Sequence, residues 1–122
     1  NPIPKINSYE TVPVIMTAPN GPTPDAGWPV VILAHGITSC KENMLAVTAA
    51  LTQQGFATVA IDHPLHGSRG YSGINASGSS CGIDNGNATV YMNLANLLVT
   101  RDNLRQSIAD TLALRLALAL CC

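Results

Sequence analysis

The spacing of apolar and polar positions predicts three strands in the first half of the chain. Residues 11–17 are rich in β-branched side chains, and Pro13 among them indicates a strand that is irregular or lies at a sheet edge. Residues 29–34 are apolar on both faces, which is typical of a central strand covered on both sides in a parallel sheet. Residues 56–61 form a second such segment, while residues 19–28 carry the Pro, Gly, Asn and Asp of a turn-rich connection.

Two helical segments are predicted around these strands. Ser39 and Glu42 fit a capping box, in which the hydroxyl accepts from a backbone N–H three residues on and the carboxylate reaches back. Gly55 is a natural stop for this first helix. From about Tyr91 the chain is expected to become helical again. Its tail, residues 112–118, alternates with a period of two and leaves a strand open, but its Leu and Ala residues favour a largely buried helix.

The order strand, helix, strand with short links predicts a βαβ unit, whose right-handed crossover builds a parallel sheet. The expected fold class is therefore α/β, with a mostly parallel sheet and flanking helices. Residues 63–90 are rich in Gly, Ser and Asn and are expected to form one long loop. Loops of that length in a compact domain are usually functional or mobile.

Composition narrows the classes of protein that fit. The 122 residues suffice for one domain; 47% of them are hydrophobic and 11% charged, and no uninterrupted apolar run reaches the length of a membrane span. A net charge of −1 gives no electrostatic basis for binding nucleic acid. The first residues lack the pattern of a signal peptide and the last stop inside an apolar run, so we expect both ends to be cuts in a longer protein.

The first candidate for chemistry is the turn that follows the strand at 29–34. His35, Gly36, Ile37 and Thr38 come directly after it, and ligands of open α/β sheets bind at the carboxyl ends of strands. Gly36 allows a sharp turn and close approach of the backbone to a ligand. A backbone N–H just past it can stabilise a developing oxyanion. The alternative is a plain strand-to-helix turn that needs a glycine.

The second candidate is the segment DHPLHGSRG at residues 62–70, which follows the strand at 56–61 and reaches the same rim. Asp62 is expected to accept N–H groups of this loop and hold the turn, rather than to act in catalysis. The ring of His66 either contacts a substrate or bonds local backbone. Arg69 either contacts a carboxylate, lines the site or is a solvated loop residue.

These motifs together resemble the front part of the α/β-hydrolase superfamily. The resemblance rests on VVILAHGIT at residues 30–38, on DHPLHGSR at 62–69 and on their spacing. GWPVV at 27–31 and LLVTRDNLRQS at 97–107 are similar to bacterial extracellular lipases of the virulence-factor type. The resemblance covers about residues 9–120.

The resemblance implies that residues 1–122 are the N-terminal portion of one α/β-hydrolase domain, truncated before the strand that carries the nucleophile. In that family the amide after the first His-Gly pair helps to form the oxyanion hole, which corresponds here to Ile37, with Thr38 beside it and His35 and Gly36 shaping the loop. The implied parent is a secreted or cell-surface bacterial lipase or esterase that needs no cofactor and acts on lipid or small ester substrates. His66 and Arg69 are candidate substrate contacts. The chain alone is expected to be inactive, because the serine, acid and histidine of the triad come later in the family's order.

Two other sites compete with this interpretation. GSSCG at residues 78–82 matches the G-x-S-x-G pattern with Ser80 as nucleophile, but it lies in a polar loop where the motif needs a strand before it and a helix after it. His35, His63 and His66 offer imidazole ligands for a metal, yet only Asp62 adds a carboxylate, so no metal site is expected.

In the resembled fold the loops that carry Cys40 and Cys81 lie on one rim, so a disulfide between them is a hypothesis, with two free thiols as the alternative. Cys121 and Cys122 are adjacent and poor partners for each other. The sequons at Asn75 and Asn87 would mean nothing beyond a polar loop in a bacterial protein, and the motif is too short to indicate the origin of the chain.

Functions of other classes also stay open. One alternative is a catalytically inert half-domain, whose exposed sheet edge drives association with a second copy or with the remainder of its own domain. The same fold also serves peptidases, thioesterases and dienelactone-type hydrolases.

Overall fold

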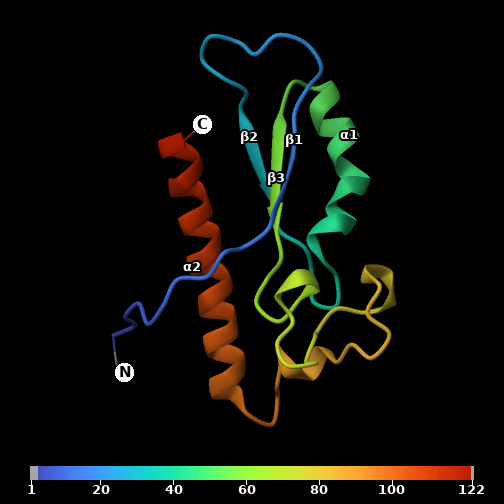
Figure 1. The fold of residues 1–122 in the computed structure, drawn as a ribbon, viewed down its shortest axis with the longest axis vertical. Helices are drawn as coiled ribbons and strands as arrows, with labels where there is room; N and C mark the ends of the chain where they lie inside the picture. The colour runs from blue at the N-terminus through green and yellow to red at the C-terminus, as the bar shows by residue number, and fades with distance from the viewer. Residues whose placement is uncertain (1–2, 122) are drawn as a thin grey trace.

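A three-stranded sheet with a helix on each side organises the protein (Figure 1), in a computed structural model that describes residues 3–121. The strands are β1 (Val14–Thr17), β2 (Val30–Leu33) and β3 (Ala57–Ile61). The expected α/β class is confirmed at this level. The side chains of Cys121 and Cys122, whose pairing was considered above, lie outside the described part.

The sheet is mixed, and the expectation of a mostly parallel sheet is not met by these strands. Their order is β1-β3-β2; β2 pairs with β3 in parallel and β1 pairs with β3 antiparallel. The parallel pair follows from the βαβ crossover. The antiparallel pair arises because the turn-rich connection between β1 and β2 sends the chain back in the opposite direction (Figure 1).

The central strand is β3, and not β2 as the sequence suggested. Every residue of β3 is buried, whereas β2 lies at an edge and Val30 in it is 46% exposed. Apolar residues on both faces identified both strands as buried types, but they did not tell which strand has a neighbour on each side. Pro13 left two alternatives for the first strand, an irregular strand or one at an edge; β1 begins directly after Pro13 and lies at an edge of the sheet.

The first helical segment begins differently from the expected capping box. A 3-10 turn, η1 (Lys41–Met44), precedes α1 (Leu45–Gln53), and neither has a side-chain cap. Ser39 Oγ accepts instead from the Asn43 side chain at 2.9 Å, and the Glu42 carboxylate pairs with Lys41 Nζ at 2.8 Å. The long-range contacts of Lys41 therefore override the local cap. Gly55, with φ of 86°, ends the segment as predicted.

The second helix, α2 (Leu97–Cys121), begins later than expected. The Asn93 side chain accepts from the backbone N–H of Ala95 and Asn96, and that of Asn96 accepts from Val99. Asparagine competes for backbone groups in this way and so delays the helix to Leu97. The segment before it is a loop, as predicted, that holds three short 3-10 turns, η2 (Gly67–Arg69), η3 (Ser79–Cys81) and η4 (Ala88–Val90).

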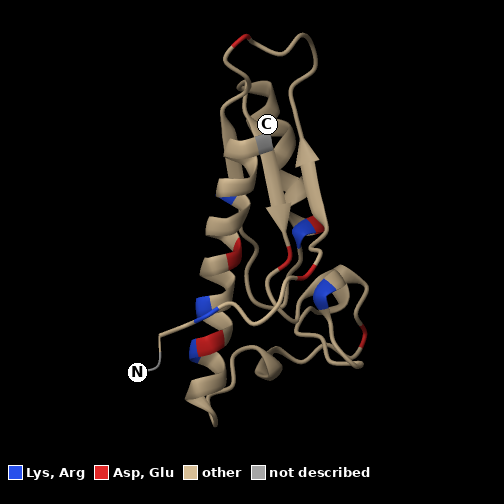
Figure 2. Ribbon diagram, turned by 60° about the vertical axis from the view of Figure 1, so that its left-hand side comes forward, with Lys and Arg blue, Asp and Glu red and all other residues tan. Residues whose placement is uncertain are grey.

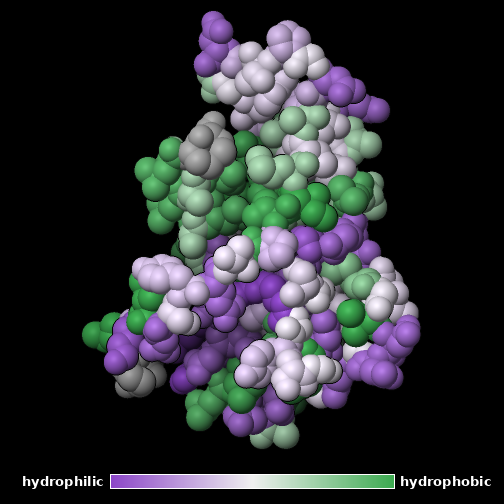
Figure 3. Space-filling view, in the orientation of Figure 1, coloured by the Kyte–Doolittle hydropathy of each residue, from purple (hydrophilic) through white to green (hydrophobic). Residues whose placement is uncertain are grey.

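The tail is helical as favoured, but the prediction that it is largely buried is wrong. Leu112 and Leu116 in the tail are exposed by half or more, as are Leu98 and Ile108 earlier in α2. In Figure 2 α2 runs as a long rod beside the sheet, and Figure 3 shows apolar side chains gathered on the face that carries α2 and the strands. Leu and Ala set the helical conformation locally, but burial needs a partner element on that side.

Candidate functional site

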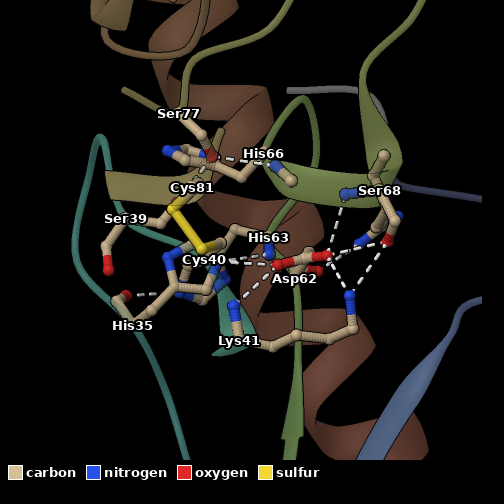
Figure 4. Close-up of polar contacts among 12 residues, drawn as sticks. His35, Ser39, Cys40, Lys41, Asp62, His63, His66, Ser68, Ser77 and Cys81 are labelled. Carbon is tan, nitrogen blue, oxygen red and sulfur yellow. Dashed lines mark hydrogen bonds and ion pairs between the residues drawn. A yellow bond between two sulfur atoms is a disulfide. The ribbon is translucent and has the colours of Figure 1, made fainter. Parts of the chain in front are cut away.

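The parallel pairing of β2 and β3 brings the two predicted turns together. Residues 35–38 follow β2, residues 62–69 follow β3, and both lie at the carboxyl ends of their strands (Figure 4). This is the rim where open α/β sheets bind ligands. The structure therefore brings the predicted residues of both turns into one cluster.

His35 joins the ends of the two strands. Its Nε2 accepts the backbone N–H of His63 at 2.9 Å, and His63 Nε2 donates to the carbonyl oxygen of His35 at 3.0 Å. Since Nε2 of His35 faces an N–H donor, the proton of this ring is assigned to Nδ1, which donates to the Gly36 carbonyl at 2.7 Å. Burial lowers the pKa of His35, opposed by the bond to Gly36. The ring is therefore a neutral connector between backbone groups.

His66 does the same for the other turn. It is fully buried; its Nδ1 donates to the Pro64 carbonyl at 3.0 Å, and its Nε2 accepts the backbone N–H of Thr38 at 3.3 Å. Its ring also contacts Tyr91 edge-on, with centroids 4.9 Å apart. Burial again lowers the pKa, so the ring is held neutral. Both nitrogens are engaged within the protein, which favours a role in positioning the turn over direct contact with a substrate.

Thr38 carries backbone strain. Its φ of 71° lies in the left-handed region, where a β-branched residue is a genuine outlier, costing on the order of 1–3 kcal/mol. Besides the bond from its N–H to His66, its carbonyl accepts from Gly78 N at 2.8 Å. Such strain persists only where the surroundings impose it, and it clusters at functional sites.

Ile37 lies between these fixed groups. Its side chain is 40% exposed, and within residues 3–121 its backbone N–H has no hydrogen-bond acceptor. Gly36 beside it is exposed, and a Cβ built there would meet no atom within 4 Å. The turn thus presents a backbone amide without a protein acceptor in an exposed position, where a ligand can reach it.

Asp62 holds the second turn, as expected from its place at the strand end. It is fully buried, and its carboxylate accepts from the backbone N–H and Nζ of Lys41, each at 2.8 Å, and from the N–H and hydroxyl of Ser68. Burial alone would raise its pKa, but these hydrogen bonds outweigh it and lower the pKa to about 2. Burial has the opposite effect on the Lys41 ammonium, whose pKa it would lower. The bonds of Lys41 to Asp62 and Glu42 outweigh burial and raise its pKa.

Arg69 contacts a carboxylate, one of the possibilities that its sequence position left open. Its Nη1 donates to Asp110 in α2 at 2.7 Å and to the Asp62 carbonyl at 3.0 Å, and its side chain is 12% exposed. It therefore ties the long helix to the second turn rather than facing solvent.

The long loop is fastened to the rim by a disulfide and a buried serine. Cys40 and Cys81 are bonded, with Cα atoms 6.1 Å apart, in agreement with the hypothesis above. Ser77 is fully buried; it donates to the Ser39 carbonyl at 2.6 Å and accepts from Gly67 N at 2.8 Å. Sequence reasoning missed Ser77, whose only local signal was its place in a sequon.

The two competing sites were a nucleophile at Ser80 and a metal site at the three histidines. Ser80 lies in η3, inside the loop, and its hydroxyl accepts from Asn43 at 3.2 Å. The rings of His35, His63 and His66 cluster with centroids 4.4–6.2 Å apart, but within the described residues no group of three His, Cys, Asp or Glu side chains is arranged to hold a metal.

Comparisons with known proteins add no relative: no family model, curated protein or solved structure matches this chain. In the described part of the chain, no helix combines the length and apolar character needed to cross a membrane.

Proposed function

We propose that this chain supplies the oxyanion-hole turn of a secreted or cell-surface α/β-hydrolase that cleaves carboxylic esters of lipid-like substrates. The observation that carries the proposal is the backbone N–H of Ile37, which has no hydrogen-bond acceptor among residues 3–121 and lies in an exposed turn at the carboxyl end of β2. An amide held in that way stabilises the negative charge that develops on an ester carbonyl oxygen under attack.

The nucleophile and its base come, in this proposal, from residues beyond those described. Both ring nitrogens of His35 and of His66 bind backbone groups, so neither is arranged as a base for Ser80. Ser80 also lacks the strand that presents a nucleophile on a sharp turn. The disulfide supports secretion, because such bonds persist in oxidising compartments.

Hydrolysis of short and long p-nitrophenyl esters tests the proposal, with the chain alone and in a longer protein that continues it through the nucleophile strand. We expect activity only in the longer protein. Ile37→Pro removes the N–H and should lower kcat by about 10²–10³-fold, whereas the matched control Ile37→Ala keeps the N–H and should retain most of the activity. Both variants are checked for folding by circular dichroism.

Four outcomes would overturn the proposal or part of it. Equal activity of Ile37→Pro and Ile37→Ala would remove the oxyanion role. Activity of the chain alone that is abolished by Ser80→Ala would make Ser80 the nucleophile. Turnover of amides or thioesters in preference to oxygen esters would place the site in a peptidase or thioesterase, and preference for an enol-lactone would indicate a dienelactone-type hydrolase.

A second candidate is an inert half-domain that self-associates. The observation in its favour is the exposed apolar face of α2, where Leu98 is 63%, Ile108 62% and Leu116 65% exposed, together with the exposed edge strand β2. Sedimentation velocity over a concentration series tests it. A dimer that is lost in an Ile108→Glu, Leu116→Glu double variant would favour this candidate, and a monomer at all concentrations would exclude it.

A further inference from the structure

The orientation of the Ile37 amide is determined by the carbonyl on the other side of the same peptide group. In a trans peptide the C=O and the N–H point in opposite directions. The Gly36 carbonyl accepts from two donors, His35 Nδ1 at 2.7 Å and Ser39 N at 3.1 Å. Because both donors hold this oxygen on one side, the N–H of Ile37 must point to the other.

The next peptide group is held by a different ring. The N–H of Thr38 donates to His66 Nε2 at 3.3 Å, and the Thr38 carbonyl accepts from Gly78 N at 2.8 Å. Three consecutive peptide groups therefore have at least one polar atom fixed. The φ of 71° at Thr38 is strained, and these bonds hold it in place. Without them, the backbone of the turn would relax to a less strained conformation, and the Ile37 peptide group would rotate with it.

We propose that His35 and His66 are positioning residues that hold two consecutive peptide groups, so that the Ile37 N–H is aimed outward at an oxyanion. The two rings act through different nitrogens: His35 holds the turn with its Nδ1 donor, and His66 holds it with its Nε2 acceptor. The role of this amide toward an ester rests on the proposed function. The orientation of the peptide groups does not.

The different use of the nitrogens explains why histidine suits both positions. His35 needs a donor at Nδ1 for Gly36 and an acceptor at Nε2 for the His63 amide. His66 needs a donor at Nδ1 for Pro64 and an acceptor at Nε2 for Thr38. A neutral imidazole provides both in one rigid ring.

Asparagine and glutamine separate the two functions. The amide group of Asn reaches about the position of Nδ1, and that of Gln reaches about the position of Nε2. His35→Asn thus keeps the donor for Gly36, and His35→Gln loses it. At His66 the order is reversed: Gln keeps the acceptor for Thr38, and Asn loses it.

Nuclear magnetic resonance of the 122-residue chain tests the orientation without any need for activity. In the wild type we expect a scalar coupling between the Thr38 amide nitrogen and His66 Nε2, across the N–H···N bond. Hydrogen exchange at Thr38 should stay slow in His66→Gln and become at least about tenfold faster in His66→Asn. The residual dipolar coupling of the Ile37 N–H should match the wild type in His35→Asn and change in His35→Gln.

Ester hydrolysis, in the form of the protein that shows it, adds a second readout. The two variants that lose the relevant contact, His35→Gln and His66→Asn, should lower kcat with KM nearly unchanged, because an oxyanion donor acts in the transition state. The variants that keep it, His35→Asn and His66→Gln, should retain a higher kcat than the variant at the same position that loses it.

The outcomes separate this proposal from the one on which it rests. The crossed pattern in the magnetic resonance data without ester hydrolysis would support the positioning role and contradict the proposed function. Hydrolysis in which Asn and Gln have equal effects at each position would keep the function and overturn the positioning role, since packing alone would then explain the loss.

Discussion

Lys41 and Asp62 form an ion pair in the interior of the rim: Nζ lies 2.8 Å from Oδ2, and the side chains are 7% and 0% exposed. The backbone N–H of Lys41 donates to the other carboxylate oxygen at 2.8 Å. One residue thus contacts both oxygens of the carboxylate, which links the start of η1 to the end of β3.

Asp62→Asn is expected to destabilise the protein strongly. The substitution leaves the Lys41 ammonium buried with only Glu42 as an anionic partner and places an NH₂ group among donors. Loss of one partner of a buried pair costs about 3–5 kcal/mol, measured as the free energy of unfolding in urea. Asp102→Asn is the matched control, because Asp102 pairs with Arg101 at the surface and its side chain is 61% exposed. Equal effects of both substitutions would contradict the structural role of Asp62.

Acid is expected to destabilise the fold in two steps. His35 and His66 have pKa values lowered from 6.5, so the unfolded chain binds their protons first and stability falls as the pH drops below 6.5. Asp62 has a pKa lowered from 3.8 to about 2, so its contribution of about 2 kcal/mol is present above pH 3.8 and lost between pH 3.8 and 2. The neighbouring groups His63 and Asp62 act on His66 in opposite senses, the first lowering and the second raising its pKa.

Urea midpoints at a series of pH values from 8 to 2 would show both steps. His66→Gln cannot bind a proton, so its midpoint should fall less than that of the wild type between pH 7 and 5. The same variant should keep the step between pH 3.8 and 2, which belongs to Asp62. A wild-type midpoint that is flat from pH 7 to 5 would mean that neither ring is held neutral by the fold.

Reduction of the Cys40–Cys81 bond is expected to destabilise the protein by about 2–4 kcal/mol, because the bond closes a long loop in the unfolded chain. Thiol titration of the denatured chain should show two fewer free thiols before reduction than after it. Four free thiols in the unreduced sample would exclude the bond. The double variant Cys40→Ser, Cys81→Ser should reproduce the loss of stability and be insensitive to reductant at this site.

Gly67→Ala is expected to be more destabilising than Gly73→Ala. Both glycines have positive φ, 49° and 77°, so both variants bear the cost of a side chain in the left-handed region, about 1–2 kcal/mol. At Gly67 the added Cβ would also lie 2.6 Å from the carboxylate of Asp62, whereas at Gly73 it would meet nothing within 4 Å. The difference between the two unfolding free energies isolates the steric part, and a difference near zero would mean that Asp62 is not so close.

Local pattern was enough to predict the elements that lie near the site. The three strands, the helix ended by Gly55, the long loop and the helical tail all follow from short-range periodicity and from the preferences of Gly, Pro, Leu and Ala. The place of Asp62 at a strand end also predicted that it holds its loop. Those features depend on residues close in sequence, and neighbouring side chains determine them.

The pairing of distant residues could not be obtained in this way. The sequence suggested a capping box at Ser39. Lys41 instead donates its backbone N–H to Asp62, 21 residues away, and Ser39 accepts from the Asn43 side chain, so the box does not form. It gave no reason to single out Ser77, which is buried between the Ser39 carbonyl and the Gly67 amide. Contacts of this kind depend on how the loops meet at the rim.

The sequence by itself determined which segments are strands and helices, and that two His-Gly turns follow two apolar strands. The tertiary structure decided that β3 is central, that the sheet is mixed and that the apolar face of α2 is exposed. It also decided the protonated nitrogen of His35 and of His66, because each ring faces a backbone N–H from the other turn. The physical reason is one of range: backbone preferences and side-chain periodicity act within a few residues, whereas strand order, burial and hydrogen-bond partners depend on groups that only folding brings together.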